Sequence, residues 1–119
     1  METPVNTAVK FLVSEPEEFY FDNGDGPFDG VIVGYSPGVM FVKARSELRY
    51  NNKKLRYLAA VARYDGESIS ELKGDLHLVV NLAPILIDDG VSDTSLEELV
   101  NLAKQFRGQH LIGEIWVAV

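Results

Sequence analysis

Hydrophobic and polar residues alternate along most of the chain, the pattern of strands that bury one face. In the first such stretch Val9, Phe11 and Val13 share one face and Lys10 lies on the other. Pro84 is expected to interrupt pairing, because proline has no N–H to donate to a neighbouring strand. The pattern predicts strands over residues 7–13, 30–35, 39–50, 53–64, 75–82 and 110–118.

Two neighbouring stretches, 39–50 and 53–64, fit an antiparallel hairpin that turns at Asn51-Asn52. In the simplest register Leu48 faces Leu55 and Glu47 faces Arg56, which sorts apolar residues to one face and charged residues to the other. The alanines of 53–63 also allow a helix there. Strand is the preferred interpretation, because the register constrains more residues than the helix propensity does.

One segment, 95–107, has the 3.6-residue period of an amphipathic helix. Thr94 and Glu97 have the spacing of a capping box, and Gly108 is a typical residue after a helix end. The predicted apolar stripe consists of Leu96, Leu99, Val100, Ala103 and Phe106. Segment 15–21 stays open, because its capping spacing favours a helical turn and its aromatic run favours a strand.

These elements predict a single α+β domain over residues 1–119. An antiparallel sheet of about five or six strands would carry the 95–107 helix on one face. The apolar strand 110–118 would follow the helix as the last element of the chain. The length of 119 residues suffices for one hydrophobic core. No apolar run reaches the roughly 20 residues that span a bilayer, and the N-terminus has no signal-peptide pattern. The absence of cysteine excludes disulfides and favours a cytoplasmic location.

Charge is distributed unevenly along the chain. The net charge is −7, yet residues 43–63 hold seven of the 11 basic residues and one acid, Glu47. This window carries +6 and leaves −13 for the remainder of the chain. A row of arginines on a strand face can bind carboxylates or phosphates in a bidentate manner. The alternative is that the basic residues pair with acids inside the protein, Glu47 with Arg56 for example.

The sequence Gly34-Tyr35-Ser36-Pro37-Gly38 has the G-x-S-x-G spacing of a serine hydrolase nucleophile elbow. In an elbow the residue after the serine gives an N–H to the oxyanion hole, and Pro37 has none. Proline followed by glycine is instead the preferred pair of a type II turn. The sequence therefore predicts a turn, and Ser36 is not expected to be a nucleophile.

Two histidines, His77 and His110, lie in predicted strands, and neither spacing demands a metal site. Glu114 lies in the apolar strand 110–118. Its carboxylate is expected on a solvated face of this strand, and the alternative is a partly buried carboxylate with a raised pKa. Trp116 has the same parity as Glu114, so this face is a candidate binding surface. A pocket near His77, His110 and Glu114 would suit a small enzyme or a small-molecule binding protein.

Because the sequence shows no set of residues typical of a catalytic site, a non-enzymatic protein is the preferred prediction. The expected function is a small acidic binding or inhibitor module that engages another macromolecule through charge, with a protein as partner and no cofactor or metal. The alternative is a small enzyme, or a protein that binds a nucleotide or phosphate-type anion at the basic hairpin 43–63. Membrane and nucleic acid are not expected partners, and exposed strand edges leave oligomer formation open. The predicted binding residues are Lys43, Arg45, Arg49, Lys54, Arg56 and Trp116.

Overall fold

The computed structural model of the chain describes residues 2–15, 24, 26–50, 53–63, 68–74, 76–86, 94–105 and 111–118. Of residues 50, 53, 54 and 86 it describes the backbone only. Segment 16–23, the turn 51–52 and His110 lie outside these ranges, and so do Phe106 and the following glycine of the predicted helix end.

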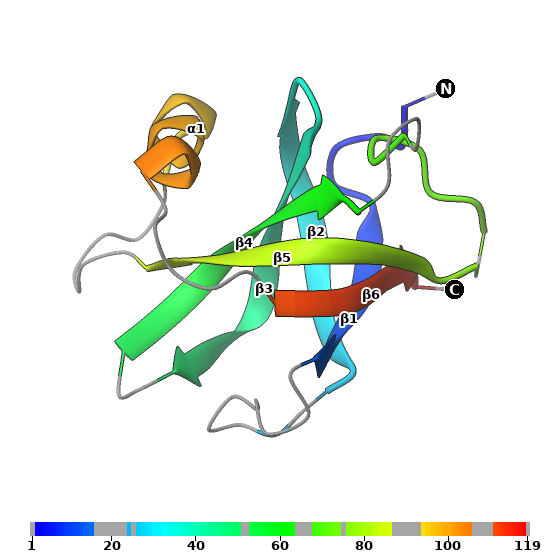
Figure 1. Ribbon diagram of the computed structural model, residues 1–119, viewed down its shortest axis with the longest axis horizontal. Helices are drawn as coiled ribbons and strands as arrows, with labels where there is room; N and C mark the ends of the chain where they lie inside the picture. Colours follow the sequence, from blue (N-terminus) through cyan, green and yellow to red (C-terminus); the bar gives the residue numbers. More distant parts are fainter. Residues whose placement is uncertain are drawn as a thin grey trace.

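The described chain forms six strands that close into an antiparallel barrel in sequence order, each strand pairing with the next (Figure 1). One short helix lies between the last two strands. The elements are β1 (Ala8–Glu15), β2 (Phe28–Ser36), β3 (Val39–Tyr50), β4 (Lys53–Ala62), β5 (Leu78–Leu86), α1 (Leu96–Gln105) and β6 (Leu111–Val117). The open α+β sheet expected from the sequence is therefore wrong, because β6 joins both β5 and β1 and leaves no sheet edge between them.

The barrel closes along the seam between β1 and β6. Register runs from Val9 opposite Val117 to Val13 opposite Gly113, and a bulge follows before Glu15. A side chain at Gly113 would overlap the Leu12 carbonyl and the Leu82 side chain. Glycine lets the two strands approach closely there. Bulges also interrupt the β2–β3, β3–β4 and β4–β5 ladders, and such irregularities give a sheet the curvature that closure needs.

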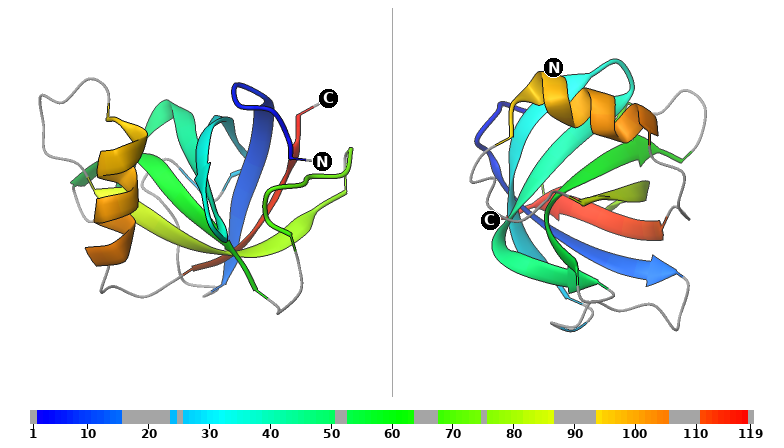
Figure 2. Two further views of the ribbon diagram at one scale, coloured as in Figure 1. Left: turned by 90° about the horizontal axis from the view of Figure 1, so that it is seen from above. Right: turned by 90° about the vertical axis from the view of Figure 1, so that its left-hand side faces the viewer.

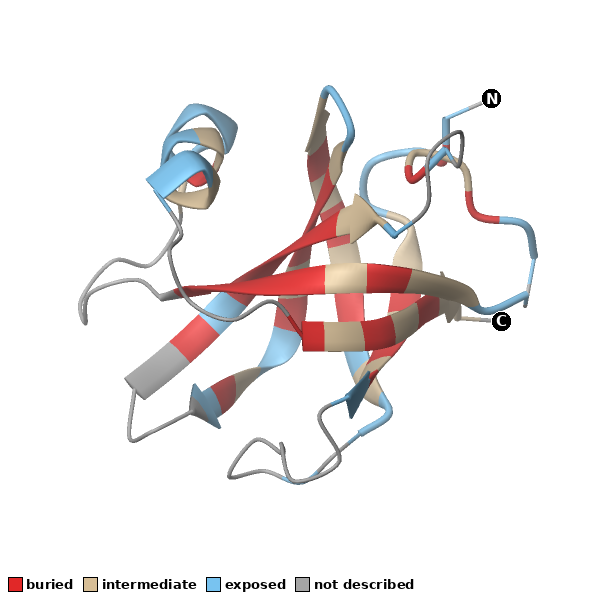
Figure 3. Ribbon diagram, in the orientation of Figure 1, coloured by how far each residue is buried: buried red, intermediate tan, exposed pale blue. Residues whose placement is uncertain are grey.

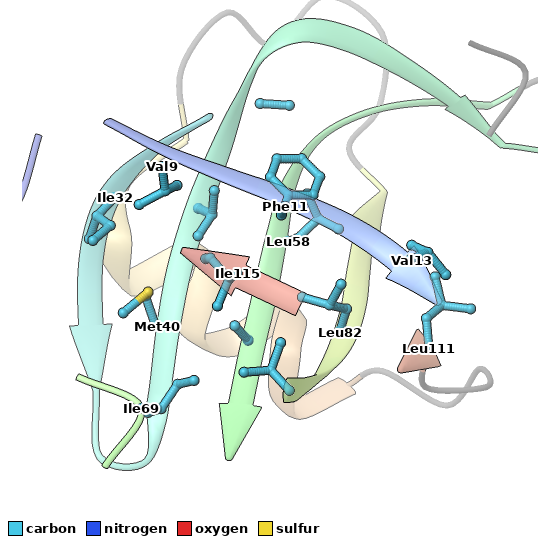
Figure 4. Close-up of a cluster of buried hydrophobic side chains, with 14 of the residues drawn as sticks. Val9, Phe11, Val13, Ile32, Met40, Leu58, Ile69, Leu82, Leu111 and Ile115 are labelled. Carbon is cyan, nitrogen blue, oxygen red and sulfur yellow. The ribbon is translucent and has the colours of Figure 1, made fainter. Parts of the chain in front are cut away.

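The interior of the barrel is filled by apolar side chains from all six strands (Figure 4). Alternate positions of β1, β2 and β6 are buried, as the striped ribbons of Figure 3 show. Phe11, Ile32, Leu58, Leu82 and Ile115 are each at most 1% exposed. A six-stranded barrel is narrow enough for its own side chains to fill.

One end of the barrel is covered by the segment 68–74. Ile69 and Leu72 of this segment belong to the interior cluster, and Figure 4 shows Ile69 beside Met40. Thr3 fastens the N-terminus to the same segment, because its N–H donates to the Ser70 carbonyl and its hydroxyl accepts from the Leu72 N–H. These bonds satisfy a polar residue that is only 8% exposed.

The helix α1 covers part of the barrel's outer surface (Figure 2). Leu99 is buried against Phe41, Tyr57, Ala59, Ala83 and Ile85, which point outward from β3, β4 and β5. The predicted amphipathic helix is thus confirmed, although it spans Leu96–Gln105 rather than 95–107. The predicted cap at Thr94 is wrong, since the Ser95 hydroxyl accepts the hydrogen bond from the Glu98 N–H.

Two further expectations about the strands need correction. β5 continues through Pro84, which pairs with Leu58 of β4. The described β5–β6 ladder ends before this point, at Leu82 and Leu111, so the missing proline N–H is not needed by β6. The predicted strand 75–82 includes Leu76, but β5 begins at Leu78 and Leu76 is 66% exposed. In the described parts of the chain no helix is long and apolar enough to cross a membrane.

Candidate functional site

The basic window of the sequence lies on the β3–β4 hairpin. Segment 53–63 is strand, so the hairpin interpretation is confirmed and the helix alternative is wrong. The predicted register holds near the turn, where Leu48 faces Leu55 and Arg49 faces Lys54. It then shifts at a bulge between Lys43 and Leu48, so that Lys43, not Ser46, faces Tyr57. The simple register failed because a bulge adds residues to one strand only.

The distal half of this hairpin extends beyond its described pairing with β2, and its tip extends beyond the described pairing with β5. The last described β2–β3 pair is Gly30 with Ala44, and the last described β4–β5 pair is Leu55 with Leu86. We call this distal half, residues 45–50 and 53–56, the basic ribbon. Its inner side chains, Leu48 and Leu55, still join the buried interior cluster. The basic ribbon is therefore anchored by one apolar face and presents the other to solvent.

Three arginines of the basic ribbon, Arg45, Arg49 and Arg56, are exposed. Glu47 lies between two of them, with its carboxylate oxygens 3.7 Å from Arg49 Nε and 3.8 Å from Arg56 Nη2. The predicted Glu47–Arg56 pair is thus present. Both arginine side chains keep about half of their surface in water (57% and 49%), so these long contacts are weak.

The remaining predicted basic residues contribute in different ways. Lys43 lies outside the basic ribbon, with its ammonium 5.8 Å from the centre of the Tyr57 ring. Tyr57 is itself 4% exposed, beneath the helix side of the barrel. The backbone of Lys54 lies in β4, and its side chain is among those outside the description. The part of the predicted site that the structure describes as exposed is the arginine trio with Glu47.

Trp116 lies in a different place. It belongs to the C-terminal end of β6, and the views of Figures 1 and 2 place this end and the basic ribbon on opposite sides of the molecule. The imidazole of His77 stacks on the Trp116 indole, with ring centres 3.8 Å apart and planes 7° from parallel. His77 Nδ1 is 3.1 Å from Glu114 Oε1. The structure therefore brings His77, Glu114 and Trp116 together, and separates them from the arginines.

The environment of this second cluster is half solvated. Side chains of His77 and Glu114 are 45% and 31% exposed, which agrees with the preferred solvated face for Glu114. An ionised carboxylate only accepts hydrogen bonds, so Nδ1 is the donor and the Nε2 atom is left for other contacts. His110, the third member of the expected pocket, lies outside the described residues. Among the residues that are described, no three His, Asp or Glu side chains group as metal ligands would.

The Ser36 motif forms a turn. Ser36 pairs with Val39, and Pro37-Gly38 connect β2 to β3 with a φ of 77° at Gly38, as a type II turn requires. Beside it, the Tyr35 hydroxyl donates to the Thr3 carbonyl at 2.5 Å. Burial first, and the negative charge of Glu2 second, raise the pKa of Tyr35 above its ordinary value of 10.0. Nothing in this geometry activates Ser36.

Comparison of the chain with protein-family models, with curated proteins and with solved structures gives no match. The function therefore has to be argued from the two surfaces themselves.

Sequence reasoning missed two features of these surfaces. The first is that one acid, Glu47, contacts two arginines, Arg49 on its own strand as well as Arg56. The second is a concavity beside His77, lined by residues of segments 68–73 and 76–78. The parity of Glu114 and Trp116 was visible in the sequence, but the approach of His77 to both required the β5–β6 register.

Proposed function

We propose that this protein is a non-enzymatic binding module that engages an acidic macromolecular surface through the basic ribbon of β3 and β4. The observation that carries the proposal is that this ribbon extends beyond the described pairing with β2, and at its tip beyond that with β5, with three exposed arginines and one acid. Arginine forks match carboxylates in geometry, so a row of them favours a partner with clustered acidic side chains.

The rest of the fold supports an external binding surface. The barrel interior is occupied by the protein's own side chains, so a ligand meets the outside of the barrel. Leu48 and Leu55 hold the base of the basic ribbon in the core, which limits the backbone ordering that binding would otherwise cost. Glu47 contacts both Arg49 and Arg56, but one carboxylate cannot neutralise two guanidinium groups.

The partner class also follows from charge. The whole chain carries −7, which opposes binding to the continuous negative charge of nucleic acid more than binding to a local acidic patch. A protein partner therefore remains the preferred one, with a phosphate-bearing small ligand as the alternative for the same arginines. The cytoplasmic location expected from the absence of cysteine belongs to the same proposal.

The test uses fluorescein-labelled poly-L-glutamate as an acidic polypeptide of defined chemistry. Its affinity is measured by fluorescence anisotropy at ionic strengths of about 0.05 M and about 0.3 M, since exposed charge pairs weaken as salt screens them. The ribbon variant carries Arg45→Gln, Arg49→Gln and Arg56→Gln together. The control carries Lys10→Gln, Lys73→Gln and Lys104→Gln, which removes the same charge elsewhere.

We expect the ribbon variant to lose at least about tenfold in affinity at the lower salt, and the control about threefold or less. Far-UV circular dichroism checks that both variants keep the fold. Equal losses in the two variants would show that only net charge matters, and the proposal would be wrong. Affinity that does not respond to salt would contradict its electrostatic basis.

A further inference from the structure

A concavity of about 440 Å³ lies between segment 68–74 and the start of β5. Its size falls within the range of pockets that hold small ligands, about 300–1,000 Å³. The segments that line it lie on the side of the molecule away from the basic ribbon (Figure 1), so the concavity is independent of the proposed function. The residues that line it are Ser68, Glu71, Leu72, Lys73, Leu76, His77 and Leu78.

The pocket has an apolar part made by three leucines. Leu72 is 9% exposed and Leu78 is half-buried, and both contact the interior cluster. Leu76 is 66% exposed, the most exposed large hydrophobic side chain in the described residues. A ligand with a hydrocarbon body that covers Leu76 would remove this apolar surface from water, which is favourable in proportion to the area buried.

His77 forms one wall of the pocket in a fixed orientation. Trp116 covers one face of the imidazole, and Glu114 accepts from Nδ1. Since neither Trp116 nor Glu114 lines the pocket, the imidazole presents its remaining surface to it. Two restraints of this kind pre-orient a side chain before a ligand arrives, which lowers the entropy cost of binding.

The charged groups around the imidazole define the ligand's polar end. Among the described residues they are Glu114 on β6, Lys10 opposite Trp116 on β1, and Glu71 and Lys73 on the pocket rim. Glu71 has an interaction partner of its own. Lys73 is exposed, and protonated His77 can donate from Nε2 while Nδ1 stays with Glu114. Two donors that can carry positive charge at the rim of an apolar pocket match a carboxylate.

We propose that this pocket binds a small apolar carboxylate, with the hydrocarbon body on Leu72, Leu76 and Leu78 and the carboxylate at Lys73 and His77. When His77 is protonated it adds a second donor beside the Lys73 ammonium, and its positive charge is compatible with both Glu114 and the ligand. Trp116 acts as a positioning residue that keeps the imidazole against the pocket.

Octanoate is the probe and 1-octanol is its uncharged match. Binding is followed by backbone amide shifts in ¹⁵N-labelled protein and by the fluorescence of Trp116, the only tryptophan in the chain. We expect saturable shifts in residues 68–78 with octanoate, at least about fivefold tighter binding than octanol at pH 6, and a change in Trp116 emission.

Variants separate the two halves of the pocket. Lys73→Met is expected to weaken octanoate about fivefold and leave octanol unchanged, and Lys104→Met on α1 is its control. Leu76→Ser is expected to weaken both probes, with Val5→Ser as the control because Val5 is also exposed (47%). His77→Gln removes the imidazole that stacks on Trp116, and it is expected to weaken octanoate and leave octanol nearly unchanged.

The proposal would be overturned by octanoate and octanol binding equally, or by shifts that spread over the surface without saturation up to millimolar probe. It would also be overturned if Lys73→Met and Lys104→Met weakened octanoate to the same degree. The ribbon variant is a cross-check, because it should bind octanoate normally even if poly-L-glutamate binding is lost.

Discussion

The two halves of the β3–β4 hairpin show how one pair of strands serves two purposes. In the half nearer the Pro37-Gly38 turn, residues 39–44 and 57–62, one face fills the barrel and the other packs beneath α1. In the basic ribbon, one face reaches the core through Leu48 and Leu55, and the other carries exposed arginines. The covered half is apolar on both faces except at Lys43, and the ribbon is apolar on one face.

The bulge in β3 separates these halves. It changes the register by three residues between Lys43–Tyr57 and Leu48–Leu55, so outward positions in one half do not continue in line into the other. Stability and recognition are therefore divided between the two halves of the hairpin. Substitutions in the covered half should destabilise the protein, whereas substitutions of the exposed ribbon residues should mainly change what it binds.

The largest expected effect is from Phe41→Ala in the covered half. Phe41 of β3 is fully buried in the cluster with Leu99 of α1. Replacing a buried phenylalanine with alanine lowers the free energy of unfolding by about 3–5 kcal/mol. Urea denaturation measures it. Arg45→Ala in the ribbon is the matched comparison and should change stability by about 0.5 kcal/mol or less. Similar losses of stability in the two variants would contradict the division of stability and recognition between the two halves.

A smaller effect is expected at the turn that begins the covered half. Gly38→Val should cost about 1–2 kcal/mol, because a φ of 77° is unfavourable for a residue with a side chain, although the space around Gly38 is open. Ser36→Ala should leave stability and any binding nearly unchanged. If the serine variant lost function while staying folded, the turn interpretation of this motif would be wrong.

Tyr35→Phe tests the hydrogen bond between the Tyr35 hydroxyl and the N-terminal residue Thr3. The variant loses the hydrogen bond to the Thr3 carbonyl and should be about 1 kcal/mol less stable at neutral pH. The raised pKa of Tyr35 means that the folded protein favours the neutral hydroxyl, so its contribution declines as pH rises above about 10. The gap between the two proteins should narrow in urea titrations at alkaline pH, and a gap that widens would contradict this assignment.

The smallest effect concerns the ribbon's own acid. Glu47→Gln removes two long contacts to half-exposed arginines, so stability should change by less than about 1 kcal/mol. Affinity for poly-L-glutamate should rise about two- to threefold, because Arg49 and Arg56 lose a competing carboxylate. Anisotropy with Glu15→Gln as a control separates a local effect from a change in net charge. A fall in affinity would mean that Glu47 orients the arginines more than it competes for them.

Much of the local structure could be predicted from alternation. Each predicted strand is present, and the boundaries of β3 agree because apolar and charged residues alternate up to its turn. Barrel closure could not be predicted in this way, because it depends on which strand β6 pairs with, and a strand pattern does not name its partners. The cap at Ser95 was missed since serine and threonine are adjacent and both are good caps.

The residues of the two candidate surfaces could be predicted from the sequence in part. The basic residues of the ribbon are visible as a charge cluster in the sequence, and so is the shared parity of Glu114 and Trp116. Their spatial relations depend on bulges and on long-range pairing. His77 meets Trp116 only because β5 and β6 align Leu78 with Ile115.

The most direct test of the central claim is to map the poly-L-glutamate contact by amide chemical shifts in ¹⁵N-labelled protein. The account predicts that the largest shifts fall in the basic ribbon, at residues 45–49 and 55–56, and fade as salt is raised. Shifts concentrated on α1 or on residues 71–78, with the ribbon unaffected, would contradict it.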